Sequence, residues 1–139
     1  MNFSDLILEW YDKNKRDLPW RKSKDPYKIW ISEIILQQTK ISQGIKYYLR
    51  FLNKFPNLKS LANSSENEVL LSWQGLGYYS RARNLHKSAK KIYFELENIF
   101  PKKYDSLLKL KGIGDYTASA ISSICFNEKN AVLDGNVYR

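Results

Sequence analysis

The sequence predicts an all-α fold, and three observations support this class. Apolar residues recur at spacings of three and four along nearly the whole chain, which is the helical period. No segment shows the alternation of apolar and polar residues that a half-buried strand requires. Glycines and prolines separate the periodic segments. With 139 residues, 43% of them hydrophobic, the chain is long enough for one domain with a core of its own.

The first half of the chain predicts three helices. One lies within residues 1–19, with Ser4 as a possible cap, and "RDLPW" ends it. A second opens at "DPY", where proline suits the first turn, and continues through "KIWISEIILQQTK". The third covers roughly "SQGIKYYLRFLNKF" and stops at Pro56, because proline cannot continue a helix.

A fourth helix is predicted by a capping pattern. In "SSENEVLLSW" either Ser64 or Ser65 can cap the helix, with Glu66 or Glu68 behind it. The two glycines of "GLG" end this helix.

A fifth helix, in "YYSRARNLHKSAKKIYFEL", has the clearest pattern of the chain. Its apolar stripe consists of Ala82, Leu85, Ala89, Ile92 and Leu96. The residues expected largely away from the stripe are Arg81, Arg83, His86, Lys87, Lys90 and Lys91. This side of the helix is either a binding face or an ordinary solvated surface, and His86 is expected to lie on the surface.

The net charge of +9, from 23 Lys and Arg against 14 Asp and Glu, favours a polyanionic partner. A proteome rich in lysine would explain the same excess. Cys125 is the single cysteine, in the apolar stretch "SAISSICF", and is expected to be a buried, inert thiol. One cysteine excludes a disulfide framework or a cysteine-rich metal site within this chain. We find no signal peptide and no apolar run of membrane-spanning length, and therefore expect a cytoplasmic, nucleoid-associated protein.

The segment "LLKLKGIGDYTASAI" predicts two helices joined by a tight turn. Gly112 and Gly114 permit a positive φ angle and a close approach by another backbone, and Ile113 can anchor the turn. Amides of the turn and of the next helix N-terminus can bind an anion such as a phosphate. A plain corner between two helices would also use glycines. The whole pattern resembles the helix-hairpin-helix of DNA repair proteins, although Asp115 adds a negative charge beside the expected phosphate.

Five stretches in order carry a wider resemblance: "WYDKNKRDLPWR", "DPYKIWISEIILQQTK", "GLGYYSRARNLHKSAK", "LKGIGDYTASAI" and "LDGNVYR". Together they resemble the MutY-type adenine DNA glycosylases of the endonuclease III superfamily. The resemblance implies a six-helix barrel in residues 20–133, with the helix-hairpin-helix at about 104–126. It also implies that helix 1–19 packs on helices beyond residue 139, and that 134–139 begin a further helix.

The resemblance also implies a catalytic set. Glu33 matches the general acid, Asp134 the second catalytic carboxylate and Asn136 an active-site asparagine, while Tyr116 matches a tyrosine beside that carboxylate. The chemistry of the residues agrees, since release of a base needs an acid for the leaving group and a carboxylate for the cationic sugar. Apolar neighbours are expected to raise the pKa of Glu33.

The pattern around Glu33 allows another interpretation. On a helical wheel Glu33 lies with Ser32, Gln37 and Lys40 on a polar arc, which indicates an ordinary surface residue. Ile29 and Leu36 interrupt that arc, as they would on a helix that faces a ligand cleft. Asp134 can equally be a helix N-cap.

The resemblance implies a set of binding residues as well. Gln38 and Tyr78 match residues that wedge into the duplex, and Arg21 and Leu36 match the lining of the adenine pocket. The residues expected to bind the DNA backbone are Lys111, Gly112, Ile113 and Gly114.

The implied function is hydrolysis of adenine mispaired with 8-oxoguanine or guanine in double-stranded DNA, by a monomer. Tyr116 stands where bifunctional relatives carry a Schiff-base lysine, which favours a monofunctional enzyme. The family's [4Fe-4S] cluster is implied, but its cysteine ligands would lie beyond residue 139, and we expect no metal or cofactor in this chain. We expect this chain to be a weak or inactive fragment. Two alternatives remain: a mismatch thymine DNA glycosylase and a non-catalytic helix-hairpin-helix DNA-binding module.

Overall fold

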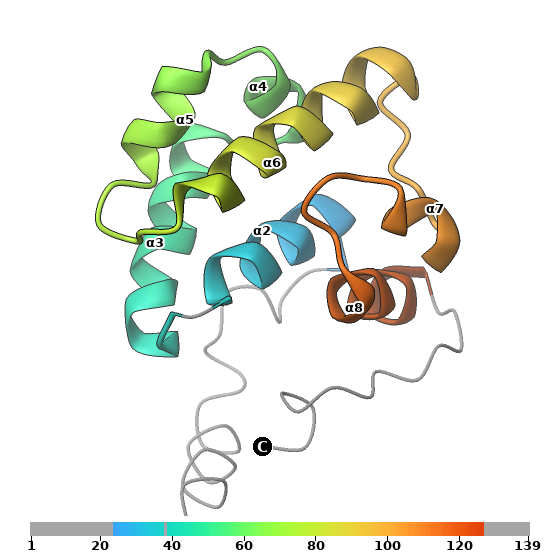
Figure 1. Ribbon diagram of the computed structural model, residues 1–139, viewed down its shortest axis with the longest axis horizontal. Coiled ribbons are helices and arrows are strands. Elements are labelled where there is room, and N and C mark those ends of the chain that lie inside the picture. Colours follow the sequence, from blue (N-terminus) through green and yellow to red (C-terminus); the bar gives the residue numbers. More distant parts are fainter. Residues whose placement is uncertain (1–23, 38, 127–139) are drawn as a thin grey trace, which may run out of the picture.

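The computed structural model describes residues 24–37 and 39–126 (Figure 1). Several expectations therefore lie outside the described residues. They concern the helix in 1–19, the helix start at 134–139, and Arg21, Gln38, Asp134 and Asn136. The side chain of Cys125 is also not described.

The described residues form helices and no strand, which confirms the predicted all-α class. The α-helices and one π-helical turn, η2, are α2 (Pro26–Leu36), α3 (Ile41–Lys54), α4 (Leu58–Ala62), α5 (Glu66–Ser72), α6 (Tyr79–Lys90), η2 (Lys91–Glu95), α7 (Tyr104–Leu108) and α8 (Asp115–Phe126). Among them, no helix has both the length and the apolar character needed to cross a membrane.

Helices α2 and α6 form the middle of the molecule (Figure 1). Helix α2 packs against α3 on one side and against α8 on the other, while α6 packs against α4 and α5. Helices α7 and α8 pack against each other as a pair. The loop between them extends toward α6 and α2, as the orange segment of Figure 1 shows. This placement brings the hairpin next to the end of α2.

The core forms where the apolar faces of these helices meet. Its largest fully buried side chains include Trp30 of α2, Phe51 of α3 and Trp73 after α5. The Tyr27 hydroxyl donates a hydrogen bond of 2.6 Å to the carbonyl of Phe55, which ties the start of α2 to the end of α3. Burial raises the pKa of Tyr27 because it disfavours the phenolate. Helix α2 is thus held firmly on both sides.

Local capping explains where the helices begin. The Asp25 carboxylate accepts from the amide of Tyr27 at 3.0 Å, and Pro26 occupies the first position of α2. Of the two serines considered, Ser65 is the cap of α5. Asn57 and Ser60 form a reciprocal capping box at α4, a helix that the sequence analysis did not predict. A five-residue helix is too short to show a period, so the capping box is its signal.

Two expectations for the helix in residues 78–96 are wrong. His86 is 3% exposed instead of lying on the surface, because it faces the segment between α4 and α5, and its Nε2 lies 2.9 Å from the carbonyl oxygen of Ser64. Leu96 leaves the apolar stripe and is exposed, since η2 ends at Glu95 and the chain turns through positive φ angles at Glu97 and Asn98.

Candidate active site

Three segments that are distant in sequence meet at one place. They are the last turn of α2, the first turns of α6, and the loop between α7 and α8 (Figure 1). Between them lies a small cavity of about 130 Å³. Its lining residues are Ile34, Gln37, Ser80, Arg81, Asn84, Leu85, Lys111 and Gly112. Its polar side chains are the two cations Arg81 and Lys111 and three groups that can both donate and accept, on Gln37, Ser80 and Asn84.

Glu33 lies in the last turn of α2 and is half-buried. Both of its chain neighbours, Ser32 and Ile34, are buried. The expectation of a solvent-facing polar arc is wrong for Ser32, which is 1% exposed and donates its hydroxyl hydrogen to the carbonyl of Ile29 at 2.7 Å. The reason is that α2 packs on both α3 and α8, so that little of its surface remains for water.

Leu36 and Gln37 end the same helix. Leu36 is half-buried and lies over Gly44 of α3, where an added Cβ atom would be 2.7 Å from the Leu36 Cδ2 atom. Gln37 is the C-cap residue, and its backbone turns away from the helix there. The expected adenine-pocket residue Leu36 is therefore placed by a glycine on the neighbouring helix.

Tyr78 and Tyr116 lie at the starts of two further helices. Tyr78 precedes α6 with a φ angle of 50°, and its side chain is 64% exposed. A non-glycine residue with this backbone conformation is uncommon, and a large exposed ring on it is available for a ligand. Tyr116 is half-buried in the first turn of α8. The adjacent Asp115 accepts a hydrogen bond from the hydroxyl of Tyr104 on α7, which raises the pKa of Tyr104.

The glycine pattern predicts a positive φ angle and a close approach at both Gly112 and Gly114, and the structure shows these features at Gly112 only. Gly112 has a φ angle of 81°, and an added Cβ atom would lie 2.9 Å from the Cβ atom of Asn84. Ile113 is 5% exposed and anchors the turn. Gly114 has no left-handed φ angle, and nothing lies within 4 Å of where its Cβ would be. Its carbonyl accepts the first helical bond of α8, from Ala118, at 2.9 Å.

The hairpin is also tied to α6. The buried Ser88 hydroxyl donates to the backbone carbonyl of Lys111 at 2.7 Å, while Lys111 as a whole is exposed. Sequence reasoning missed Ser80 and Asn84 as members of this site. Their four-residue spacing places both on one face of α6, and this spacing next to a glycine turn is the signal that could have found them.

Two arginines of α6, Arg81 and Arg83, do not contribute a free positive charge to the expected basic face. Arg81 is half-buried and points toward α2, with its Nη1 donating to the carbonyl of Ile34 at 2.9 Å. Arg83 is exposed but pairs with Glu66 at 3.1 Å. Lys87, Lys90 and Lys91 are exposed, as expected.

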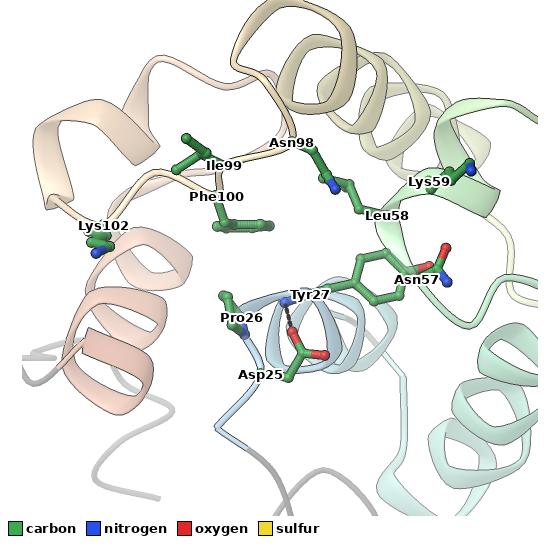
Figure 2. Close-up of a pocket in the computed structure, with 10 residues that line it drawn as sticks. All are labelled: Asp25, Pro26, Tyr27, Asn57, Leu58, Lys59, Asn98, Ile99, Phe100 and Lys102. Carbon is green, nitrogen blue, oxygen red and sulfur yellow. Dashed lines mark hydrogen bonds between the residues drawn. The ribbon is translucent and has the colours of Figure 1, made fainter.

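A larger cavity, of about 560 Å³, lies at the opposite end of α2, around Asp25 and Phe100 (Figure 2). Figure 2 shows Asp25 bonded to the amide of Tyr27, so its carboxylate serves as the helix cap. None of the sequence-predicted site residues lines this cavity. Of the predicted residues that the structure describes, Lys111 and Gly112 line the smaller cavity. Glu33 and Leu36 belong to the same end of α2 as Ile34 and Gln37, which line it too. The remaining described residues of the prediction, Tyr78, Ile113, Gly114 and Tyr116, are not in its lining.

Across residues 24–37 and 39–126, no three His, Cys, Asp or Glu side chains gather in a group that could hold a metal ion. The chain's single cysteine cannot supply four thiolate ligands, so its residues do not fit a [4Fe-4S] cluster by themselves.

Comparisons with known proteins agree on one family. A family model described as "HhH-GPD superfamily base excision DNA repair protein" matches residues 31–139. The chain is 49% identical to an adenine DNA glycosylase of Buchnera aphidicola over 99% of its own length, and spans 39% of that relative.

Two solved structures share the fold. A thermostable thymine-DNA glycosylase aligns with a TM-score of 0.80 and 30% identity, over 96% of this chain and 62% of that one. A non-covalent endonuclease III–DNA complex aligns with a TM-score of 0.75 and 21% identity, over 99% of this chain and 66% of that one.

Proposed function

Because the chain belongs to the HhH-GPD superfamily of base excision DNA repair proteins, we propose that it acts in a DNA glycosylase that hydrolyses the N-glycosidic bond of adenine mispaired with 8-oxoguanine or guanine. One observation carries the proposal. The end of α2 that carries the half-buried Glu33, the start of α6 that follows the exposed Tyr78, and the glycine hairpin all contribute residues to the lining of one small polar cavity. An acid, a wedge and a backbone anchor are the three parts that chemistry on a stacked base requires.

Binding begins with the DNA backbone. Gly114 leaves open space at the N-terminal end of α8, where amides without helical partners can meet a phosphate. The exposed Lys111 adds a positive charge beside this turn. Tyr78 and Gln38 then open the base stack, and Leu36 and Arg21 contact the extruded adenine.

Chemistry follows once the base is extruded. Glu33 protonates the purine, which turns adenine into a better leaving group and breaks the bond between its nitrogen and the sugar carbon. Asp134 stabilises the cationic sugar, with Asn136 and Tyr116 beside it. Water then adds to that carbon and gives one proton to the carboxylate of Glu33, which restores the acid. Tyr116 has no amine to form a Schiff base, so the product is an intact strand with an abasic site. A [4Fe-4S] cluster held by further residues and a monomeric state are parts of the same proposal.

The test is single-turnover excision with this chain, alone and fused to the C-terminal part of the Buchnera relative. Duplexes carry adenine opposite 8-oxoguanine, adenine opposite guanine, or thymine opposite guanine. We expect the fusion to release adenine from both adenine duplexes and to leave strands intact until alkali is added. We expect the 139-residue chain alone to be slow or inactive. Borohydride is expected to trap little covalent complex.

A second candidate, a mismatch thymine glycosylase, is favoured by the similarity to the solved thymine-DNA glycosylase. The same assay separates the two enzymes, since release of thymine without adenine would replace our proposal. Duplex binding without any excision by the fusion would support a non-catalytic DNA-binding module.

A further inference from the structure

Arg81 is the residue through which the end of α2 and the start of α6 are joined. Its guanidinium Nη1 lies 2.9 Å from the carbonyl of Ile34 and 3.4 Å from that of Ile35, and it also donates to the carbonyl of Gln37. Its Nη2 lies 3.4 Å from the carbonyl of Gly77. The contacts with Ile34, Ile35 and Gln37 span more than 40 residues of sequence and are tertiary, whereas the contact with Gly77 is local.

The contacts have a clear electrostatic basis. The last carbonyls of a helix have no intrahelical donor and carry the negative end of the helix dipole. A guanidinium is planar, permanently charged and presents several donors, so one arginine can serve several of these carbonyls together. Burial lowers the pKa of Arg81, while Tyr78 acts in the opposite direction.

The same guanidinium makes cation–π contacts with two aromatic rings. Its central carbon lies 5.4 Å from the ring centre of the fully buried Trp73 and 5.7 Å from that of Tyr78. The Trp73 Nε1 atom donates to the Gly77 carbonyl at 3.2 Å, the acceptor that Nη2 also approaches. The unusual backbone of Tyr78 is therefore attached to the core on one side and to α2 on the other.

We propose that Arg81 is a positioning residue for base extrusion, which locks the Gln37 turn and Tyr78 into one rigid unit beside Glu33. This inference rests on the proposed function, because it concerns the same site. Base stacking in the duplex opposes any residue that inserts between the bases. If the Gln37 turn and Tyr78 moved independently, this resistance would displace Tyr78 without extruding the base. Arg81 transmits the force to the buried core through Trp73 and to α2 through its carbonyls.

The test separates duplex binding from extrusion. The probe is a duplex with 2-aminopurine opposite 8-oxoguanine, whose fluorescence rises when that base leaves the stack. The original chain, fused to the C-terminal part as in the excision assay, is compared with Arg81→Lys in the same fusion. This substitution retains the charge but lacks the planar set of donors. Arg83→Lys is the matched control, because Arg83 lies two residues along the same helix, is exposed and pairs with Glu66. Affinity is measured by fluorescence anisotropy, and folding by thermal melting.

We expect Arg81→Lys to bind the duplex within about threefold of the original chain, since the charge is retained. The fluorescence rise at saturation is expected to fall roughly tenfold, about the effect of losing one hydrogen bond to a charged group. Arg83→Lys is expected to match the original chain in both.

Three results would overturn the inference. Arg81→Lys with the original fluorescence rise would show that the lock is not needed. Unfolding of Arg81→Lys while Arg83→Lys stays folded would make Arg81 a residue of overall stability instead. These two results leave the proposed function standing. The third is an original chain that neither binds the duplex nor raises the fluorescence, which would overturn the inference and the proposed function together.

Discussion

The proposed role of Glu33 comes from the helix that carries it. A carboxylate between two buried neighbours, on a helix packed on two sides, is shielded from much of the solvent. The residue type alone would not distinguish Glu33 from Glu95, which is exposed in η2.

Replacing Glu33 by Gln is expected to slow adenine release by the fusion protein about 10²–10⁴-fold. The amide preserves the shape of the side chain but cannot deliver the proton, so duplex affinity should change little. Single-turnover excision and anisotropy measure the two effects. Glu95→Gln removes one carboxylate from an exposed position and is expected to excise normally. A near-normal rate with Glu33→Gln would remove Glu33 from the mechanism.

His86 predicts a pH dependence of stability. Burial lowers the pKa of His86 in the folded chain, and the nearby Lys90 lowers it further, against the opposing effects of the Ser64 carbonyl and Glu66. The unfolded chain therefore binds the proton at a higher pH than the folded chain. Stability from this residue is complete above the unfolded pKa of about 6.5 and is lost as the pH falls below it.

We expect the Tm of the original chain to fall between pH 7.5 and pH 5.5 by more than the Tm of His86→Gln. His86 is the only histidine of the chain, so the difference between the two proteins reports this group. Circular dichroism at several pH values makes the measurement. Parallel melting curves at every pH would contradict the assignment of a neutral, buried imidazole.

At the scale of elements, the hairpin and the α5–α6 turn both depend on glycine. Gly112 and Gly77 have similar φ angles, 81° and 74°. An added Cβ atom at Gly77 would meet nothing within 4 Å, whereas at Gly112 it would press on Asn84. Substitution at Gly77 therefore reports backbone strain alone, whereas substitution at Gly112 reports backbone strain together with steric crowding.

Gly77→Ala is expected to cost about 1–2 kcal/mol of unfolding free energy from the left-handed backbone alone. Gly112→Ala is expected to cost more, by about 1–3 kcal/mol, because the hairpin must move away from α6. Urea unfolding of both variants tests this. Equal losses would mean that the hairpin does not rest on Asn84.

Gly114, in the same hairpin, is not required by the fold. Its position has room for a side chain and needs no left-handed backbone, so Gly114→Ala should keep the fold and lower the free energy of unfolding by about 1 kcal/mol or less. The methyl group would obstruct a phosphate that approaches the amides, and we expect duplex affinity to fall roughly tenfold. Anisotropy against a plain duplex measures it. Unchanged affinity would show that the phosphate does not bind at this turn.

At the scale of the whole molecule, the charge of +9 predicts binding that weakens steeply as salt rises. Each phosphate contact contributes a slope of about −0.9 in a plot of log affinity against log salt. Lys111→Ala is expected to make this slope shallower by about 1, because Lys111 lies beside the hairpin. Lys102→Ala is the control, since Lys102 lines the larger cavity at the far end of α2 (Figure 2). If Lys102→Ala changes the slope as much as Lys111→Ala does, duplex binding is not confined to the hairpin end.

The sequence by itself determined the helical class, most helix boundaries and the hairpin. These features depend on local signals: the apolar period, Pro26 and Pro56, a serine cap at 64 or 65, and a glycine at a turn that needs a positive φ angle. It also indicated Glu33 and Tyr78 through the family resemblance. The short helix α4 has only its capping box as a signal, and was missed for that reason.

Only the tertiary structure decided which polar residues face inward. Ser32, Arg81 and His86 all occupy positions that a single helix presents to solvent, and each is covered by a different neighbour. Ser32 lies on α2, which packs between α3 and α8, while Arg81 is covered by the end of α2 and His86 by the segment before α5. Helical period reports one apolar face, but burial depends on how many helices surround the element. For that reason the meeting of α2, α6 and the hairpin around one cavity could not be predicted from the pattern of any one of them.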